Sequence, residues 1–231
     1  MDKKPLTLLG FISAVTATAC LTCRIAAAEK LQFTITVHVY DYADVSDKTL
    51  TTAMDEGSRI FKYAGLNIKW VNQRADGVNR EGPEDSNQPW DRTHFVVRML
   101  KHPRRGLGQL ALGEALSFRI ANIFLDRVTL QSAAGELSAG TVLGHAIAHE
   151  LGHLLLGDSS HGSSGIMVAR WSKQDLRSMS EGGLLFTQKE ELRIQTELRQ
   201  RTLDNDVSSS AKPFLTQRSF PSSSSTPAPS D

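Results

Sequence analysis

The chain has 231 residues, with 26 Lys and Arg against 25 Asp and Glu, and 40% of its residues are hydrophobic. This balance of charge, without a strongly basic patch, argues against a nucleic-acid partner. The length and composition predict one globular domain of ordinary size with extensions at the two ends.

Residues 1–28 have the pattern of an export signal. Lys3 and Lys4 carry positive charge, residues 6–21 are mostly apolar, and three alanines at 26–28 offer a cleavage site before Glu29. The apolar stretch is short for a membrane span, so we expect cleavage rather than stable membrane insertion. The protein is therefore predicted to be secreted or periplasmic.

Both cysteines, Cys20 and Cys23, lie inside this signal. A mature chain that begins near Glu29 would have no thiol and no disulfide, so its stability would come from a hydrophobic core and a bound metal. Removing residues 1–28 leaves 23 basic and 24 acidic residues, a net charge of −1. The alternative interpretation is a lipoprotein signal, with Cys20 as the acylated anchor.

Residues 29–206 are predicted to form the domain. Residues 31–40 alternate apolar and polar side chains, which indicates a strand with one buried face. Residues 46–64 predict a helix that ends before Gly65, and residues 66–71 a second strand. The polar, Gly- and Pro-bearing stretch 72–92 is predicted to be a surface loop.

The second half of the domain continues the mixed pattern. Residues 94–100 predict a third strand, the glycine-rich stretch 106–116 a short edge strand, and residues 119–125 a strand directly before a helix that ends at Gly157. Residues 187–201 predict a closing amphipathic helix, and the Ser- and Pro-rich residues 207–231 a disordered tail. The order predicts an α+β fold, a mixed sheet backed by two helices, with a small C-terminal subdomain that contains a helix.

Residues 149–161, with the sequence HELGHLLLGDSSH, are the most informative segment. On a helix, His149 and His153 project from the same face and can bind one Zn²⁺ through imidazole nitrogens. Glu150 lies about 100° round the helix, where a carboxylate can take a proton from water activated by the metal. Ser138 is a candidate N-cap of this helix, and Gly157 would end it and let His161 return as a third ligand.

These residues resemble the metzincins, and among them the matrixin-like zinc peptidases, whose signature is HExxHxxGxxH followed by a Met-turn. His149, Glu150 and His153 match the first half of that signature. Gly157, His161 and Met167 correspond in order to the later glycine, the third histidine and the Met-turn methionine. The resemblance spans about residues 31–167. It implies a zinc peptidase in which Met167 forms an apolar floor beneath the histidines.

Two departures from the family pattern concern spacing. Gly157 and His161 follow His153 by four and eight positions, where the family has three and six, and only residues 162–166 separate His161 from Met167. A third departure concerns the tyrosine that some metzincins place after the Met-turn to stabilise the oxyanion. That role would fall here to zinc, backbone N–H groups or an arginine, because the tyrosines of this chain lie far upstream, at Tyr40, Tyr42 and Tyr63.

The identity of the third ligand has alternatives. We expect His161, with Asp158 as its nearest competitor. A gluzincin-type site would instead use a distant glutamate, for which the candidates are Glu181, Glu190 and Glu191. Other conspicuous side chains are predicted to be structural: His145 in the core or in contact with the metal ligands, and His38, His94 and His102 without ligand spacing. Arg170 and Trp171 follow the Met-turn closely enough to border a cleft, although Trp171 is expected to pack in the core.

The predicted function is that of a secreted, monomeric zinc endopeptidase with Glu150 as general base and then acid, and with peptides or proteins as substrates. An extended substrate would pair with an edge of the sheet. The alternative from a different functional class is a zinc-stabilised binding protein without peptidase activity. Glu150 argues against it, because a structural site does not need a carboxylate beside an open coordination position.

Overall fold

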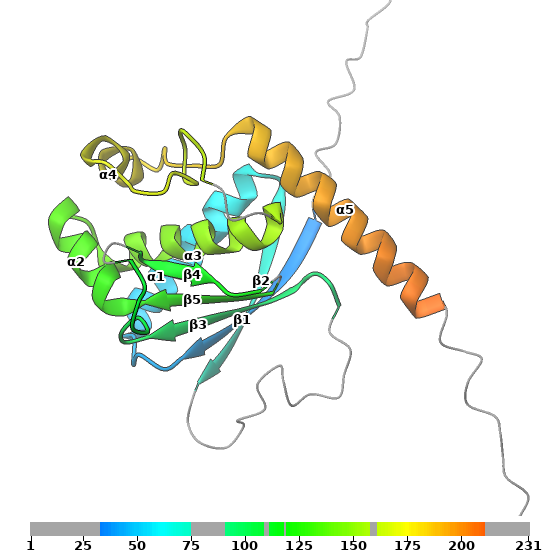
Figure 1. Cartoon of the computed structure of the whole chain (residues 1–231), viewed down its shortest axis with the longest axis horizontal. Helices are drawn as coiled ribbons and strands as arrows, with labels where there is room; N and C mark the ends of the chain where they lie inside the picture. The colour runs from blue at the N-terminus through cyan, green and yellow to red at the C-terminus, as the bar shows by residue number, and fades with distance from the viewer. Residues whose placement is uncertain (1–32, 75–90, 109–110, 118, 158–160, 211–231) are drawn as a thin grey trace, which may run out of the picture. The chain divides into compact units, whose positions relative to one another are not determined.

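The computed structural model describes residues 33–74, 91–108, 111–117, 119–157 and 161–210 (Figure 1). The predicted signal with its cysteines, most of the predicted loop 72–92, and Asp158 lie outside the described residues. Within them the elements follow this order: β1 (Phe33–Asp41), α1 (Asp47–Tyr63), β2 (Leu66–Arg74), β3 (His94–Leu100), β4 (Gly113–Ala115), β5 (Ile120–Phe124), α2 (Leu125–Gly135), α3 (Ala139–Leu156), α4 (Lys173–Ser180) and α5 (Gln188–Ser210).

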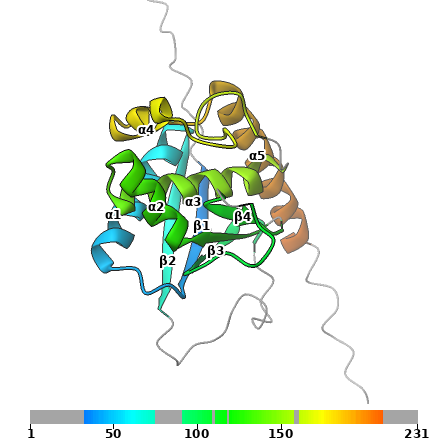
Figure 2. The ribbon, with the colours of Figure 1, turned by 60° about the vertical axis from the view of Figure 1, so that its left-hand side comes forward.

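The strands form one sheet in the order β2-β1-β3-β5-β4. The β1–β2, β1–β3 and β3–β5 pairs are parallel, whereas β4 runs antiparallel to β5 and forms one edge. Helices α1 and α3 lie on one face of this sheet, as both views of the ribbon show (Figures 1 and 2). The predicted α+β fold with a mixed sheet backed by two helices is confirmed.

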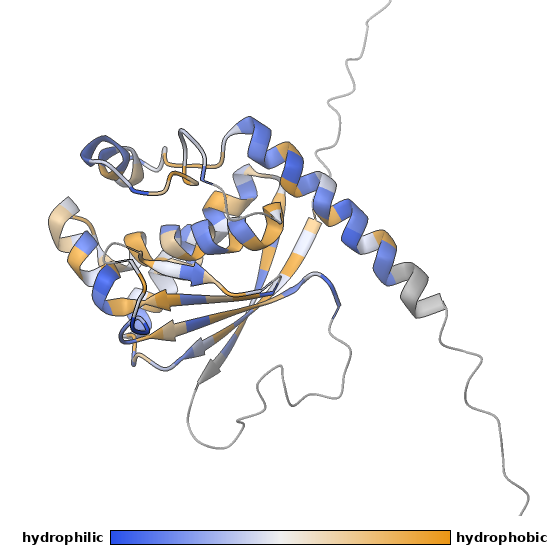
Figure 3. Cartoon of the chain, in the orientation of Figure 1, coloured by the Kyte–Doolittle hydropathy of each residue, from blue (hydrophilic) through white to orange (hydrophobic). Residues whose placement is uncertain are grey.

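The alternating pattern of β1 explains which face is covered. Ile35, Val37 and Val39 are fully buried in the hydrophobic core, whereas Thr36 and His38 between them are more exposed. The same alternation of hydrophobic and hydrophilic residues is visible along the strands in Figure 3. Because successive side chains of a strand point to opposite faces, one period-2 pattern specifies both the strand and its orientation.

Glycines in α3 bring it close to α1. A Cβ added to Gly144 would lie 2.7 Å from the carbonyl oxygen of Ala53, and one added to Gly140 would lie 2.6 Å from Cβ of Thr52. Contacts below 3 Å leave no room for a side chain, so glycine at these two positions allows the two helices to pack this closely. The α3 helix thereby packs closely beside α1 on the same face of the sheet, which fixes the platform that carries residues 149–153.

Two predicted boundaries between elements are wrong. The second strand extends to Arg74 rather than ending at Val71, because its ladder with β1 continues through the pair Asp41↔Arg74. The strand β5 does not lead directly into the motif helix, because α2 lies between them. Helix α2 begins within the apolar run of β5 and has no side-chain N-cap, so the sequence gives no signal for its start.

The C-terminal part contains one helix more than predicted. Helix α4 begins with a capping box in which Ser172 and Asp175 each bond the other's backbone N–H, which is a short but readable sequence signal for a helix start. Helix α5 continues past the predicted end at Arg201 to Ser210, so residues 207–210 are helical and do not belong to the predicted disordered tail. The remaining division into signal, domain and tail stays a prediction.

Candidate metal centre

Helix α3 places the motif, and both of its ends match the prediction. The Ser138 side chain accepts from the Thr141 backbone N–H at 3.0 Å, as an N-cap does. Gly157 has a left-handed φ of 71° and donates its N–H to the carbonyl of His153 at 3.1 Å. This conformation, which favours glycine, stops the helix immediately after its last turn.

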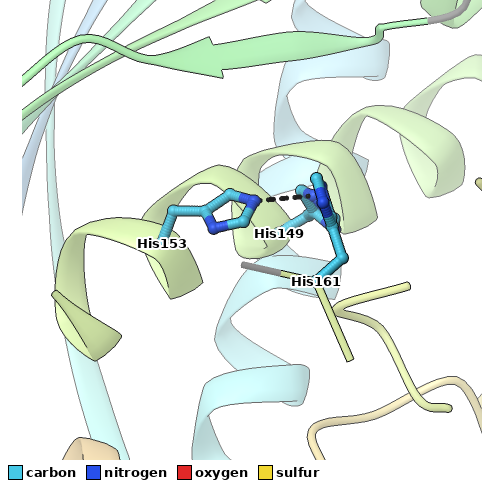
Figure 4. A group of neighbouring side chains, drawn as sticks. All are labelled: His149, His153 and His161. Atoms are coloured by element: carbon cyan, nitrogen blue, oxygen red, sulfur yellow. Dashed lines mark hydrogen bonds between the residues drawn. The ribbon is translucent and has the colours of Figure 1, made fainter. Parts of the chain in front are cut away.

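His149, His153 and His161 come together beside this helix end (Figure 4). Their ligand-type nitrogens all lie within 4.8 Å of one another, and in the part of the chain described they are the only such group of three or more His, Cys, Asp or Glu. His149 and His153 are buried, whereas His161 is exposed. The longer spacing of residues 153–161 therefore still returns the third imidazole to the first two.

The donor set fits a tetrahedral cation. Nε2 of His149 lies 3.2 Å from Nε2 of His153. Two nitrogens bound tetrahedrally at 2.0–2.1 Å from Zn²⁺ would lie about 3.4 Å apart. The ring of His161 stands at 90° to that of His153 with centroids 4.9 Å apart, and at 28° to that of His149 with centroids 5.4 Å apart, so the three rings are close neighbours. Three imidazole nitrogens suit Zn²⁺ better than hard cations, which prefer oxygen.

His149 is held in a neutral form. Burial lowers the pKa of His149 to about 4, and the charges of His153 and His161 act in the same direction. Its Nδ1 donates to the carbonyl of Ile166 at 2.8 Å, which partly opposes this shift. A neutral imidazole is the form that binds a metal, so this histidine needs no deprotonation step at neutral pH.

Glu150 follows His149 on α3, and its side chain packs against strand β4. It is 6% exposed, and burial raises the pKa of its carboxyl to about 8, with the nearby charge of Glu114 adding to the rise. A divalent cation next to the carboxyl would favour the ionised form and oppose that rise. Its neighbour on the sheet is Gly113 of β4, where a Cβ would lie 2.7 Å from Cγ of Glu150.

Met167 packs directly under the motif helix. A Cβ at Gly152 would lie 2.5 Å from the Met167 sulfur, which shows how closely the thioether covers this side of α3. The turn before it has Gly165 at a φ of 75°, and the Met167 carbonyl accepts from the N–H of Gly162 at 2.8 Å. Met167 is 1% exposed and belongs to the hydrophobic core.

The other histidines that the sequence analysis considered lie outside the triad. His145 is fully buried, with Nδ1 bonded to the carbonyl of Thr141 at 2.9 Å. His38 and His94 on neighbouring strands are 3.2 Å apart, Nε2 to Nδ1, and His102 contacts Asp126 at 3.2 Å. The prediction that His145 lies in the core is confirmed.

The three alternative glutamates lie outside the cluster of ligand atoms. Glu190 caps α5 by accepting from the Thr187 N–H at 2.7 Å, and Glu181 is the C-cap residue of α4. Neither of them, nor Glu191, is part of the triad's cluster. Among the tyrosines, Tyr40 is buried within the domain, whereas Tyr42 and Tyr63 are about half exposed.

Two parts of the site were missed by the sequence analysis. Gly113 lies against Glu150, and the Ile166 carbonyl accepts from both His149 and Trp171. A backbone acceptor carries no side-chain signature, so no residue pattern could have identified Ile166. The glycine-rich composition of residues 106–116 was the available signal for Gly113, because glycine in a strand often marks a close approach.

The five-stranded mixed sheet, the HExxH helix packed on one of its faces and the following methionine turn form a metzincin-like fold. A solved structure of this kind to which the chain is similar is archaemetzincin from Methanopyrus kandleri, with a TM-score of 0.51 and 15% identity. The match covers 76% of this chain and 99% of that chain. No protein-family model matches the chain, and no curated protein does so either. The likeness is one of fold, so the matrixin-like subtype stays a prediction.

Proposed function

We propose that the protein is an exported zinc-dependent endopeptidase, with His149, His153 and His161 as the metal ligands and Glu150 as the general base and acid. The observation that carries this proposal is the cluster of three convergent imidazoles together with the buried carboxyl of Glu150, which follows His149 on the same helix. The similarity of the fold to archaemetzincin supports it. A zinc ion bound there would polarise the scissile carbonyl and lower the pKa of the attacking water to about 7.

Glu150 would accept the proton of that water and later give it to the leaving amine. Its burial beneath β4 excludes bulk water and makes proton transfer to the carboxylate favourable, because the neutral acid is the better-tolerated form in an apolar setting. Gly113 leaves space for the carboxyl at the sheet surface. The role of the protein around Glu150 would be to hold its carboxyl within reach of the attacking water and the scissile peptide bond.

The edge strand supports a peptide as the substrate. In the described part of the chain, β4 pairs with β5 on one side and forms the end of the sheet on the other. An extended peptide can bind such an edge through main-chain hydrogen bonds. The position of Gly113 next to Glu150 would bring a peptide bound at this edge close to the base.

A zinc-stabilised binding protein would use the same histidines but gives no role to Glu150. Keeping a carboxyl almost fully buried costs free energy, and a structural metal site does not require it. The burial of Glu150 therefore favours the enzyme.

The proposal of export comes from residues 1–28 alone. In the part of the chain that the structure describes, no helix combines the length and the hydrophobicity that crossing a membrane requires. Secreted or periplasmic location, and a monomeric state, are parts of the proposal.

The decisive experiment replaces Glu150 by Gln in the mature protein and measures zinc content and peptide-library cleavage on the same samples. We expect Glu150→Gln to retain zinc and the wild-type fold while hydrolysis falls by several powers of ten, because the base is removed and no ligand is. Glu181→Gln is the matched control and should retain both. Wild-type cleavage by Glu150→Gln would refute the mechanism, and loss of zinc from Glu181→Gln would favour the gluzincin-type site.

A further inference from the structure

The carbonyl of Ile166 is a shared acceptor next to the candidate metal centre. It accepts from Nδ1 of His149 at 2.8 Å and from the indole Nε1 of Trp171 at 3.1 Å. A carbonyl oxygen has two lone pairs, so both bonds can form together. The Ile166 N–H in turn donates to the carbonyl of Leu185 at 2.9 Å, which holds the same residue from its other end.

This carbonyl determines which nitrogen of His149 is available. Because a carbonyl can only accept, Nδ1 must carry the proton, and in the neutral ring Nε2 then has the free lone pair. Nε2 is the nitrogen that lies 3.2 Å from Nε2 of His153. The hydrogen bond to Ile166 therefore selects the tautomer that directs a lone pair toward the other histidines.

The ring of Trp171 also packs against two histidine side chains of α3. It stands edge-on to the His149 ring, at 87° with centroids 6.0 Å apart, and edge-on to the His145 ring, at 84° and 6.2 Å. His145 is one helical turn before His149 on α3. A single rigid indole thus contacts two successive turns of the helix and packs against the hydrophobic core.

We propose that Trp171 is a positioning residue, which fixes the Ile166 carbonyl and through it the tautomer and direction of His149. The inference rests on the proposed zinc site for its functional meaning. Its first consequence, a fixed His149 tautomer, exists without any metal. Without the indole N–H, only the bond from the Ile166 N–H to Leu185 would hold this residue independently of His149. His149 would then populate both tautomers, and the lone pair on its Nε2 would be available less often.

The test compares Trp171→Phe with Trp70→Phe. Trp70 is a suitable control because its indole also donates one hydrogen bond, to Oγ of Ser58 at 2.8 Å, and its side chain also packs against the core. Nitrogen-15 NMR of the metal-free proteins at neutral pH reports the tautomer of His149. We expect one tautomer, protonated at Nδ1, in the wild type and in Trp70→Phe, and a mixture in Trp171→Phe.

Zinc affinity, measured by competition with a chromogenic chelator, provides the second readout. Loss of a group that orients a metal ligand typically weakens metal binding about 10- to 100-fold, which is the range expected for Trp171→Phe and not for Trp70→Phe. If Trp171→Phe does not fold, 3-benzothienylalanine at position 171 replaces the indole N–H by sulfur at nearly the same shape.

The outcomes separate the two proposals. An unchanged His149 tautomer and unchanged zinc affinity in the Trp171 variants would overturn the positioning role while leaving the proposed enzyme intact. Wild-type protein that binds no zinc would overturn the proposed function, and the tautomer of the metal-free variants would still decide the role of Trp171.

Discussion

The close approach of β4 to Glu150 gives a prediction about Gly113. A Cβ at this position would lie 2.6 Å from the carbonyl oxygen of Asn122, 2.7 Å from Cγ of Glu150 and 2.9 Å from its Oε1. Ordinary van der Waals contact begins at 3.4 Å, so Gly113→Ala requires a displacement of about 0.8 Å. The Asn122 oxygen is backbone in the adjacent strand β5 and yields less readily than the Glu150 side chain.

Overpacking of this kind costs about 1–3 kcal/mol of folding free energy. For a protein of this size each kcal/mol lowers Tm by about 2–4 °C, so the expected loss is roughly 2–12 °C. Displacement of a catalytic group by about 1 Å can reduce the rate about 100-fold. The three atoms nearest to the added methyl group belong to Asn122 and Glu150, and none belongs to a histidine. Zinc content should therefore stay at the wild-type value.

Thermal unfolding, zinc analysis and peptide hydrolysis of the purified variant test these expectations together. Gly108→Ala is the matched control, because a Cβ there has no neighbour within 4 Å among the described residues. A Gly113→Ala protein with wild-type Tm and wild-type activity would show that the packing of Glu150 against β4 has been misjudged. Loss of zinc from Gly113→Ala would contradict the expectation that this position affects Glu150 and leaves the three histidines in place.

Three further expectations follow from the structure and the sequence. Ser138→Ala removes the N-cap of α3 and should cost about 1 kcal/mol, measurable by urea unfolding, and an unchanged midpoint would show that the 3.0 Å bond to the Thr141 N–H contributes nothing. Removing zinc with a chelator should lower Tm, and returning zinc should restore it, because a ligand that binds the folded state stabilises it; a Tm indifferent to zinc would contradict tight binding. Secreted protein should have an intact mass that begins near Glu29, whereas a lipid on Cys20 would establish the lipoprotein alternative.

The sequence predicted those parts of the fold in which local signals and packing agree. The limits of α3 follow from Ser138 and Gly157, and β1 and β3 follow from their hydrophobic patterns. Helix α2 was missed because its start is continuous with the apolar run of β5 and lacks a capping side chain. The end of β2 was misplaced because the hydrogen bonds of its last residues depend on the partner strand β1, which a local pattern does not report.

The candidate site divides in the same way. His149, Glu150 and His153 were identifiable because a fixed helical spacing carries the geometry with it. His161 required the assumption that Gly157 turns the chain back, and the structure brings its ring beside the pair. The Ile166 carbonyl, the Trp171 contact and the Gly113 contact depend on tertiary packing between distant segments, so they became visible only in three dimensions.

The central claim is that three histidines hold one zinc ion, and a zinc-edge anomalous difference map of the zinc-loaded protein crystal tests it most directly. The account predicts one strong peak at about 2.0–2.1 Å from a nitrogen of each of His149, His153 and His161. A peak bonded to Glu181, Glu190 or Glu191 with His161 turned away, or no peak beside His149 and His153, would contradict it.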